Sequence, residues 1–215
     1  MRYTAIALCC LLTACGSVPT PPPAPTSGNT KANGELVSRP WVFQYSPNAV
    51  GSNHIQGALS FDFPNKDGIH YLVTGVNGMA PGMSSITLDY EVLTTGNPVF
   101  EFRTAADNTC PAPLGNVSLY MQRKGDDISG TGAYEYYRFW SRPLLSELKS
   151  GTATLTVPLK PDQWITVYGK QYDLSGALPN LQAIGMTFGG GCFAGHGVYV
   201  TGGTAKFNMK SYLVK

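Results

Sequence analysis

Residues 132–142 carry the most unusual set of side chains in this sequence. The segment reads Gly-Ala-Tyr-Glu-Tyr-Tyr-Arg-Phe-Trp-Ser-Arg. Side chains alternate between the two faces of a strand, so an extended chain places Tyr134, Tyr136, Arg138 and Trp140 on one face. Flat aromatic rings stack on the apolar faces of sugar rings, and arginine donates hydrogen bonds to hydroxyl groups. We therefore expect this face to line a ligand-binding groove.

Neighbouring strands can add polar side chains to the same groove. The candidates on their expected polar faces are Asp89, Glu91, Glu101, Arg103, Tyr120 and Gln122. The alternative is an aromatic-rich core strand with Arg138 in a local ion pair, because an unpaired buried arginine is costly. The sequence leaves both interpretations open.

The sequence carries no familiar catalytic motif. Gly-x-Ser-x-Gly, His-Glu-x-x-His and papain-type cysteine signatures are absent from it. Glycoside cleavage needs two carboxyl groups about 5–10 Å apart, and Asp89 or Glu91 beside Glu101 on adjacent strands would meet that distance. Such pairs occur on many sheets, so we expect a non-catalytic protein. A polysaccharide-cleaving enzyme stays as an alternative.

No metal site is defined by the sequence. His54, His70 and His196 lack His-x-His or His-x-x-x-His spacing, which favours structural or surface roles. Hard oxygen ligands near the terminal strands are Asp62, Asp67 and Asn208. They leave a structural calcium ion open without forming a ligand loop. We expect no other cofactor.

Short β-strands are the elements expected to position these side chains. From residue 39 onward the chain has no amphipathic helical pattern, and turn formers separate its β-rich runs. The runs are 58–63, 69–74, 84–93, 99–103, 117–123, 134–141, 152–159, 163–168, 183–188, 198–201 and 204–214. A single helical turn is expected at 144–149. About eleven strands with little helix predict an all-β, antiparallel two-sheet β-sandwich of the jelly-roll type.

Composition agrees with a single folded domain. The chain has 215 residues, of which 43% are hydrophobic and 13% charged, with a formal net charge of +2. The hydrophobic fraction excludes disorder of the whole chain. The low net charge gives no indication of a nucleic-acid partner.

The N-terminus predicts export and a lipid anchor. Arg2 precedes an apolar run too short to span a bilayer as a helix. Residues 12–15, Leu-Thr-Ala-Cys, then resemble the lipobox of bacterial lipoproteins. The resemblance implies lipidation of Cys15 and, with Gly16 following, anchoring in a Gram-negative outer membrane, on its periplasmic or cell-surface side. A plain secretory signal is the alternative. The expected division is 1–14 signal peptide, 15–36 lipidated cysteine with a Pro-rich tether, and 37–215 sandwich domain.

The remaining cysteines agree with export. Of the five, Cys9 and Cys10 lie in the signal and Cys15 in the lipobox, which leaves Cys110 and Cys192. An even pair in an oxidising compartment predicts a disulfide, with two separate buried thiols as the alternative. Neither has a partner at Cys-x-x-Cys spacing, so we do not expect this pair to bind a metal.

A second resemblance covers about residues 84–215. It rests on residues 155–159 (Leu-Thr-Val-Pro-Leu), Trp164 with Val167 and Gly169, 183–189 (Ala-Ile-Gly-Met-Thr-Phe-Gly), and the long strand at 205–214. These resemble the jelly-roll, galactose-binding-like carbohydrate-binding modules of bacterial glycoside hydrolases. The resemblance implies paired first and last strands, a structural calcium ion near them, and glycan binding in a concave groove without catalysis.

These patterns together predict a non-catalytic, lipid-anchored glycan-binding lipoprotein of the cell envelope. The alternative is a structural or protein-interaction lipoprotein of an assembly or phage-exclusion type. An exposed apolar patch or an uncovered sheet edge would favour that alternative. The expected partners are the membrane and a carbohydrate, with a protein partner left open.

Overall fold

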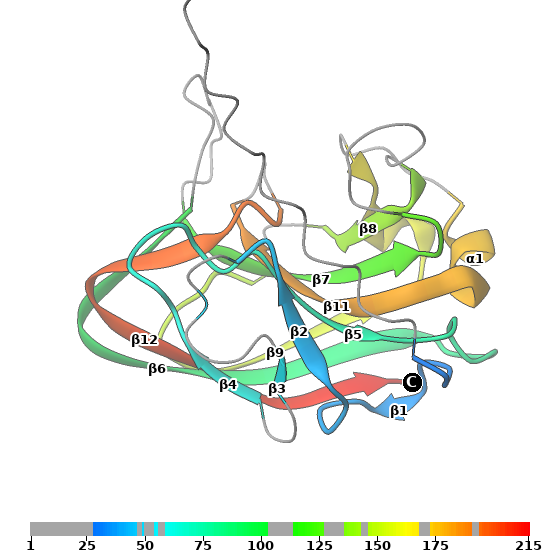
Figure 1. Cartoon of the computed structure of the whole chain (residues 1–215), viewed down its shortest axis with the longest axis horizontal. Helices are drawn as coiled ribbons and strands as arrows, with labels where there is room; N and C mark the ends of the chain where they lie inside the picture. The colour runs from blue at the N-terminus through cyan, green and yellow to red at the C-terminus, as the bar shows by residue number, and fades with distance from the viewer. Residues whose placement is uncertain are drawn as a thin grey trace, which may run out of the picture.

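Two antiparallel sheets, one of five strands and one of seven, form a sandwich (Figure 1). The structure is a computed structural model that describes residues 28–46, 49, 54–55, 59–102, 114–126, 136–142, 146–167, 173–190 and 194–215. The predicted all-β, two-sheet antiparallel sandwich is confirmed. Cys15, Cys110 and Cys192, with the predicted lipidation and disulfide, lie outside the described residues.

The five-stranded sheet has the order β1-β12-β6-β9, and β4 also pairs with β12. Its strands are β1 (Gly34–Glu35), β4 (Leu59–Asp62), β6 (Ser85–Phe102), β9 (Gly151–Pro158) and β12 (Val198–Val214). The first strand therefore pairs with the last, through Gly34 with Val214 and Glu35 with Leu213. This pairing is the one that the carbohydrate-binding-module resemblance implies.

The seven-stranded sheet has the order β10-β8-β7-β11-β5-β2-β3. Its strands are β2 (Trp41–Gln44), β3 (His54–Ile55), β5 (Tyr71–Gly75), β7 (Asn116–Arg123), β8 (Arg138–Ser141), β10 (Trp164–Ile165) and β11 (Leu181–Gly189). Helical structure in the described residues is limited to α1 (Leu174–Ala177) and short 3₁₀ turns such as Pro161–Gln163 and Leu178–Asn180. No described helix has the length and apolarity needed to cross a membrane.

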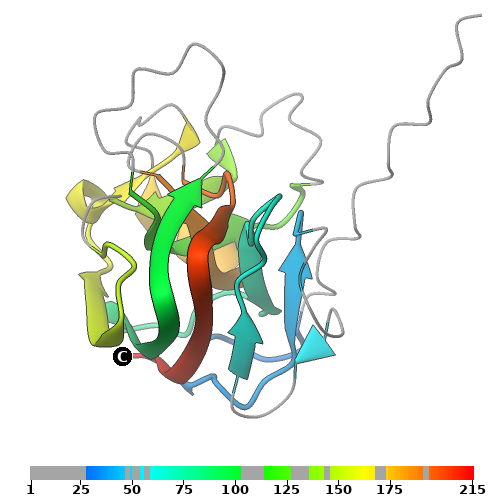
Figure 2. The same ribbon diagram turned by 90° about the vertical axis from the view of Figure 1, so that its left-hand side faces the viewer.

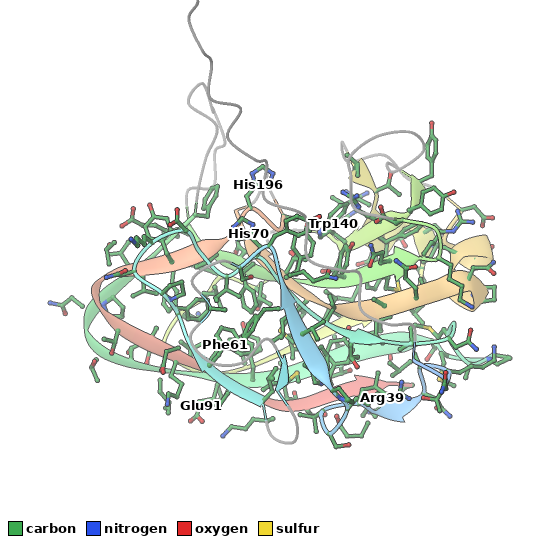
Figure 3. All side chains as sticks on the ribbon, viewed as in Figure 1. Arg39, Phe61, His70, Glu91, Trp140 and His196 are labelled. Atoms are coloured by element: carbon green, nitrogen blue, oxygen red, sulfur yellow. The ribbon has the colours of Figure 1, made fainter. Side chains whose placement is uncertain are left out.

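Aromatic side chains from both sheets fill the space between them. Phe61 lies between the two layers in Figure 3, where its ring stacks on Phe207 at 5.2 Å and meets the edge of Phe188 at 5.7 Å. The Tyr212 hydroxyl donates to the Gly185 carbonyl oxygen of the opposite sheet at 2.9 Å. Burial raises the pKa of Tyr212, so it remains a neutral donor. These contacts in the core hold the two sheets against each other.

Two long strands replace four predicted ones. Runs 84–93 and 99–103 are both part of β6, and runs 198–201 and 204–214 are both part of β12. The glycines that indicated turns instead take up positive φ angles within the paired ribbon, at 74° for Gly96 and 70° for Gly202. The pairing register also shifts between Thr201 and Gly203. Figure 2 shows the two strands bending side by side across the molecule.

Two further expectations differ from the structure. The predicted helical turn at 144–149 is extended over its described part, where Glu147 bridges to Asn116. The described helix is α1, whose N-terminus is capped by the Asp173 carboxylate accepting from the Gly176 amide at 3.0 Å. The sandwich also begins before residue 37, because Ala32 and Leu36 are fully buried.

Candidate functional site

The side of the seven-stranded sheet that faces away from the five-stranded sheet carries three rows of side chains. Strand register defines these rows, and together they form what we call the outward face. The first row is Gln44, Tyr71, Thr187 and Ser118; the second is Val42, Val73, Gly185, Tyr120, Trp140 and Ile165; the third is Gly75, Ala183, Gln122 and Arg138. Successive rows are separated by two residues, about 7 Å along a strand.

Aromatic rings cross this face in a continuous line. The Tyr120 and Trp140 ring centroids are 5.5 Å apart, and those of Tyr71 and Tyr120 are 5.1 Å apart. Tyr45 continues the line at 6.1 Å from Tyr71. Burial raises the pKa of Tyr71 to about 12 and that of Tyr120 well above its usual value. Both phenols are therefore uncharged at neutral pH and act through their rings and hydroxyl groups.

A buried ion pair lies at one end of the face. Arg138 holds Asp126 through two bonds, Nε to Oδ2 at 2.6 Å and Nη2 to Oδ1 at 2.8 Å. The side chains are 11% and 1% exposed. Burial lowers the pKa of Arg138, but the hydrogen bond and charge of Asp126 outweigh it, so the net pKa is raised. Arg138 therefore stays charged, and its two hydrogen bonds to Asp126 hold the side chains in place.

Five buried side-chain atoms of the described residues have no hydrogen-bond partner, and all five belong to this face. They are Gln44 Nε2, Gln44 Oε1, Gln122 Oε1, Trp140 Nε1 and Thr187 Oγ1. A buried polar group left without a partner costs about 1–3 kcal/mol. Native proteins have few such groups, and they cluster where a ligand or water completes them. Their gathering on one face makes this face the candidate functional site.

The structure brings together four of the eight predicted ligand-binding residues. Tyr120, Gln122, Arg138 and Trp140 all lie on the outward face, but their relative exposures are only 1%, 0%, 9% and 7%. They are thus buried, where the sequence favoured an exposed or groove-lining face. The local ion pair of Arg138 is present as well, so burial and pairing both agree with the alternative of a buried, aromatic-rich strand.

The other four predicted residues are not part of this cluster as described. Tyr136 precedes β8 and is half-buried, with its carbonyl oxygen accepting from Arg123 Nη1 at 3.4 Å. Tyr134 and Arg103 lie outside the described residues. Asp89 lies on the opposite sheet, where its carboxylate accepts from the Thr154 hydroxyl. The alternation of side chains predicts that Asp89 lies on the polar face of its strand. It does not predict which of the two sheets contains that strand.

The carboxyl pair considered for glycoside cleavage is not on adjacent strands. Glu91 and Glu101 are ten positions apart on β6, which far exceeds the carboxyl separation that cleavage needs. Glu91 is 2.8 Å from Lys210 Nζ, outside the sandwich on the side opposite Trp140 (Figure 3). Glu101 instead accepts from the Tyr199 hydroxyl at 3.1 Å.

Two of the three predicted calcium ligands contact other side chains. Asp62 lies 3.7 Å from Lys206 Nζ, and the Asn208 amide oxygen accepts from the Ser60 hydroxyl. No group of three or more His, Cys, Asp or Glu residues able to hold a metal occurs among the residues that the structure describes.

Sequence reasoning missed several members of the face. Asp126 follows β7 outside the predicted strands, and Gln44 belongs to β2, which none of the predicted strands covers. Tyr71 and Thr187 lie in predicted strands, and period-two alternation around the buried Leu72 and Met186 would have placed them outward. The sequence does not show that Tyr71 and Thr187 lie near Tyr120, because this depends on the order of the strands in the sheet.

The outward face is therefore defined by its own geometry: an aromatic line, a neutralised ion pair and unpartnered donors and acceptors. Neither a scan against models of known protein families nor a search among curated proteins finds a match for this chain.

Proposed function

We propose that this protein binds a glycan on the outward face without cleaving it. The observation that carries the proposal is the set of five unpartnered polar atoms beside the aromatic line. Ligand sites typically combine an apolar platform with a few placed polar groups. This face contains both.

The chemistry of the unpartnered atoms matches a sugar. Trp140 Nε1 is a donor, Gln122 Oε1 is an acceptor, and Gln44 and Thr187 offer both functions. Sugar hydroxyl groups also donate and accept, and the C–H faces of sugar rings are apolar enough to pack on Tyr120 and Trp140. A purely apolar ligand would leave all five atoms unpartnered.

The ligand must reach atoms that are shielded from solvent. Among the described residues, Val167 and Ala194 pack against the apolar part of the face. Both lie outside the named strands, so displacing them leaves the hydrogen-bonded ladders intact. Binding on this face therefore requires the residues that cover it to move, and displacing Val167 and Ala194 does not break the sheet.

The setting that we propose is the cell envelope. The lipobox resemblance at residues 12–15 supports a lipid anchor at Cys15, in the outer membrane of a Gram-negative bacterium. The carbohydrate-binding-module resemblance and the pairing of first and last strands support a jelly-roll binding module. The two proposals are independent, because a soluble form would present the same face.

The test is a titration of the full chain with polysaccharides, followed by tryptophan fluorescence. The protein is kept in a detergent without a sugar headgroup, and the panel includes dextran, galactan, peptidoglycan and lipopolysaccharide. We expect a saturable change with at least one of these glycans. Trp140→Phe should weaken binding about tenfold, equivalent to the loss of one hydrogen bond, and remove most of the fluorescence change.

Trp164→Phe is the matched control. Trp164 is buried on the core side of β10, and its indole donates to the Pro158 carbonyl oxygen at 2.9 Å. It should lower stability without changing glycan affinity. The proposal would be overturned if the folded protein showed no saturable fluorescence change with any glycan of the panel, or if Trp140→Phe bound its glycan with unchanged affinity.

A further inference from the structure

We infer that the outward face selects uncharged, hydroxyl-bearing sugars and rejects sugars that carry a carboxylate, sulfate or phosphate group. This inference rests on the proposed glycan binding and specifies its ligand class. It follows from how the Arg138–Asp126 pair orients Gln122 and neutralises charge on the face.

The orientation of the Gln122 amide is fixed by its neighbour. Gln122 Nε2 donates to Asp126 Oδ2 at 2.8 Å, the oxygen that also accepts from Arg138 Nε. A carboxylate only accepts hydrogen bonds, so the reversed amide would set two acceptors against each other. Gln122 Oε1 must therefore be the atom that remains unpartnered, and it requires a donor from the ligand.

Trp140 supplies the complementary function beside it. Tyr120 pairs with Trp140 and Gln122 with Arg138 across β7 and β8, which makes Gln122 and Trp140 diagonal neighbours. Diagonal side chains in a sheet lie within reach of one group between them. A hydroxyl group can donate to Gln122 Oε1 and accept from Trp140 Nε1. A carboxylate, sulfate or fully ionised phosphate cannot donate at all.

The charge of the face disfavours an anion as well. Asp126 engages Arg138 through both of its oxygens, and the outward rows hold no Lys and no Arg apart from Arg138. An anionic ligand at Gln122 would approach both its amide oxygen and the Asp126 carboxylate. Like charges brought together in a desolvated interface strongly oppose binding.

Matched neutral and acidic glycans test the inference on the unmodified protein. Dextran is compared with carboxymethyl-dextran, and galactan with the same galactan oxidised at C6 to the uronate, each at equal chain length and low salt. We expect at least about tenfold weaker binding of the acidic member of the pair that binds. Equal or tighter binding of the acidic member overturns the inference and leaves the proposed function standing. Absence of binding by all four glycans overturns the inference, and it overturns the proposed function as well when peptidoglycan and lipopolysaccharide also fail to bind.

Two variants provide a test that does not depend on the choice of glycan. Asp126→Asn removes the negative charge beside Gln122 and leaves Arg138 uncompensated, so it should reduce or reverse the preference for the neutral member. Asp126→Asn combined with Arg138→Gln makes the face uncharged but no longer fixes the Gln122 amide, so the preference should stay weaker than in the unmodified protein. Thermal melting verifies that each variant is folded. If Asp126→Asn does not fold, the double variant decides: an undiminished preference for the neutral member overturns the inference.

Discussion

Arg138 and Asp126 carry opposite charges in a place that almost excludes water. Removing one partner of a buried pair leaves the other charge uncompensated, at a cost of about 3–5 kcal/mol. We expect Arg138→Met to lower the free energy of unfolding by this amount in urea titrations. Combining it with Asp126→Leu should recover most of the loss, because apolar residues of similar size often replace such pairs without penalty.

The exposed Lys210–Glu91 pair is the control for this prediction. Lys210 Nζ lies 2.8 Å from the Glu91 carboxylate, but both side chains are open to solvent. Solvent-exposed pairs contribute little, so Lys210→Met should leave the unfolding curve unchanged. Equal effects of Arg138→Met and Lys210→Met would show that the Arg138 pair is effectively solvated.

Glu35 links the first strand, β1, to the last strand, β12, through hydrogen bonds. Its Oε1 accepts from the Leu36 and Val37 amides, both at 3.0 Å, and from the Tyr212 amide at 2.8 Å. The Ser211 hydroxyl donates to Oε2. Partial burial raises the pKa of Glu35, but these hydrogen bonds together outweigh it, so the net pKa lies below the usual 4.5.

A depressed carboxyl pKa stabilises the fold above the unfolded-state pKa and loses its effect as pH falls through the folded-state pKa. Glu35→Gln should therefore lower the free energy of unfolding by about 1 kcal/mol at neutral pH. The difference from the unmodified protein should shrink as pH falls below 4.5. Chemical denaturation at a series of pH values measures it, with Glu147→Gln on the exposed surface as control. A difference that persists undiminished at low pH would contradict the charge-based explanation.

The long β6–β12 ribbon shows how far the sequence predicts the elements. Alternation of apolar and polar residues located most strands of the sandwich. The turn formers at residues 95–98 predicted a break within β6, because Gly-Asn-Pro usually marks a chain reversal. The strand continues instead because β12 pairs with both of its halves, and β12 lies about 100 residues further along the chain. The local sequence therefore predicted an irregularity at residues 95–98 but not that the strand continues through it.

The candidate site was predictable to a similar extent. Alternation placed Arg138 with Trp140, and Tyr120 with Gln122, on common faces, and the structure joins the two pairs through β7–β8 register. Asp126, Gln44 and Asp89 were misplaced or missed because their positions depend on strand order. Strand order follows from long-range pairing and leaves no local pattern in the sequence.

Close backbone contact within the ribbon requires glycine at position 203. A Cβ atom at Gly203 would overlap the Thr95 carbonyl oxygen, which belongs to the facing backbone and cannot turn away. Gly203→Ala should therefore lower the free energy of unfolding by about 3 kcal/mol. Gly82→Ala, with a φ of 80° but open space around it, should cost only about 1 kcal/mol from backbone strain. Thermal or urea unfolding compares them, and a cost for Gly203→Ala no greater than that for Gly82→Ala would show that the ribbon relaxes easily.

At the scale of the molecule, the described residues form two buried clusters that differ in composition. The larger one, between the sheets, is almost entirely apolar and joins residues from both layers. The smaller one, on the outward face, contains Val73, Tyr120, Trp140 and Ala183 among buried polar side chains. The first cluster supplies stability, whereas the second retains unpartnered polar atoms that oppose it. Stability given up at one face is typical of a functional site.

Thr187 and Thr74 allow this division to be measured with the same substitution. Both are buried threonines in the seven-stranded sheet, with relative exposures of 0% and 1%. Thr187 Oγ1 on the outward face has no partner, whereas Thr74 Oγ1 on the core side donates to the Pro40 carbonyl oxygen at 2.8 Å. In the absence of ligand, Thr187→Val should raise the free energy of unfolding by about 1–2 kcal/mol, and Thr74→Val should lower it by a similar amount.

Thr187→Val should also weaken glycan binding, because the atom left unpartnered in the free protein is the one that the ligand completes. A loss of stability in Thr187→Val would instead mean that bound water already satisfies its hydroxyl group, and that the outward face is a hydrated core.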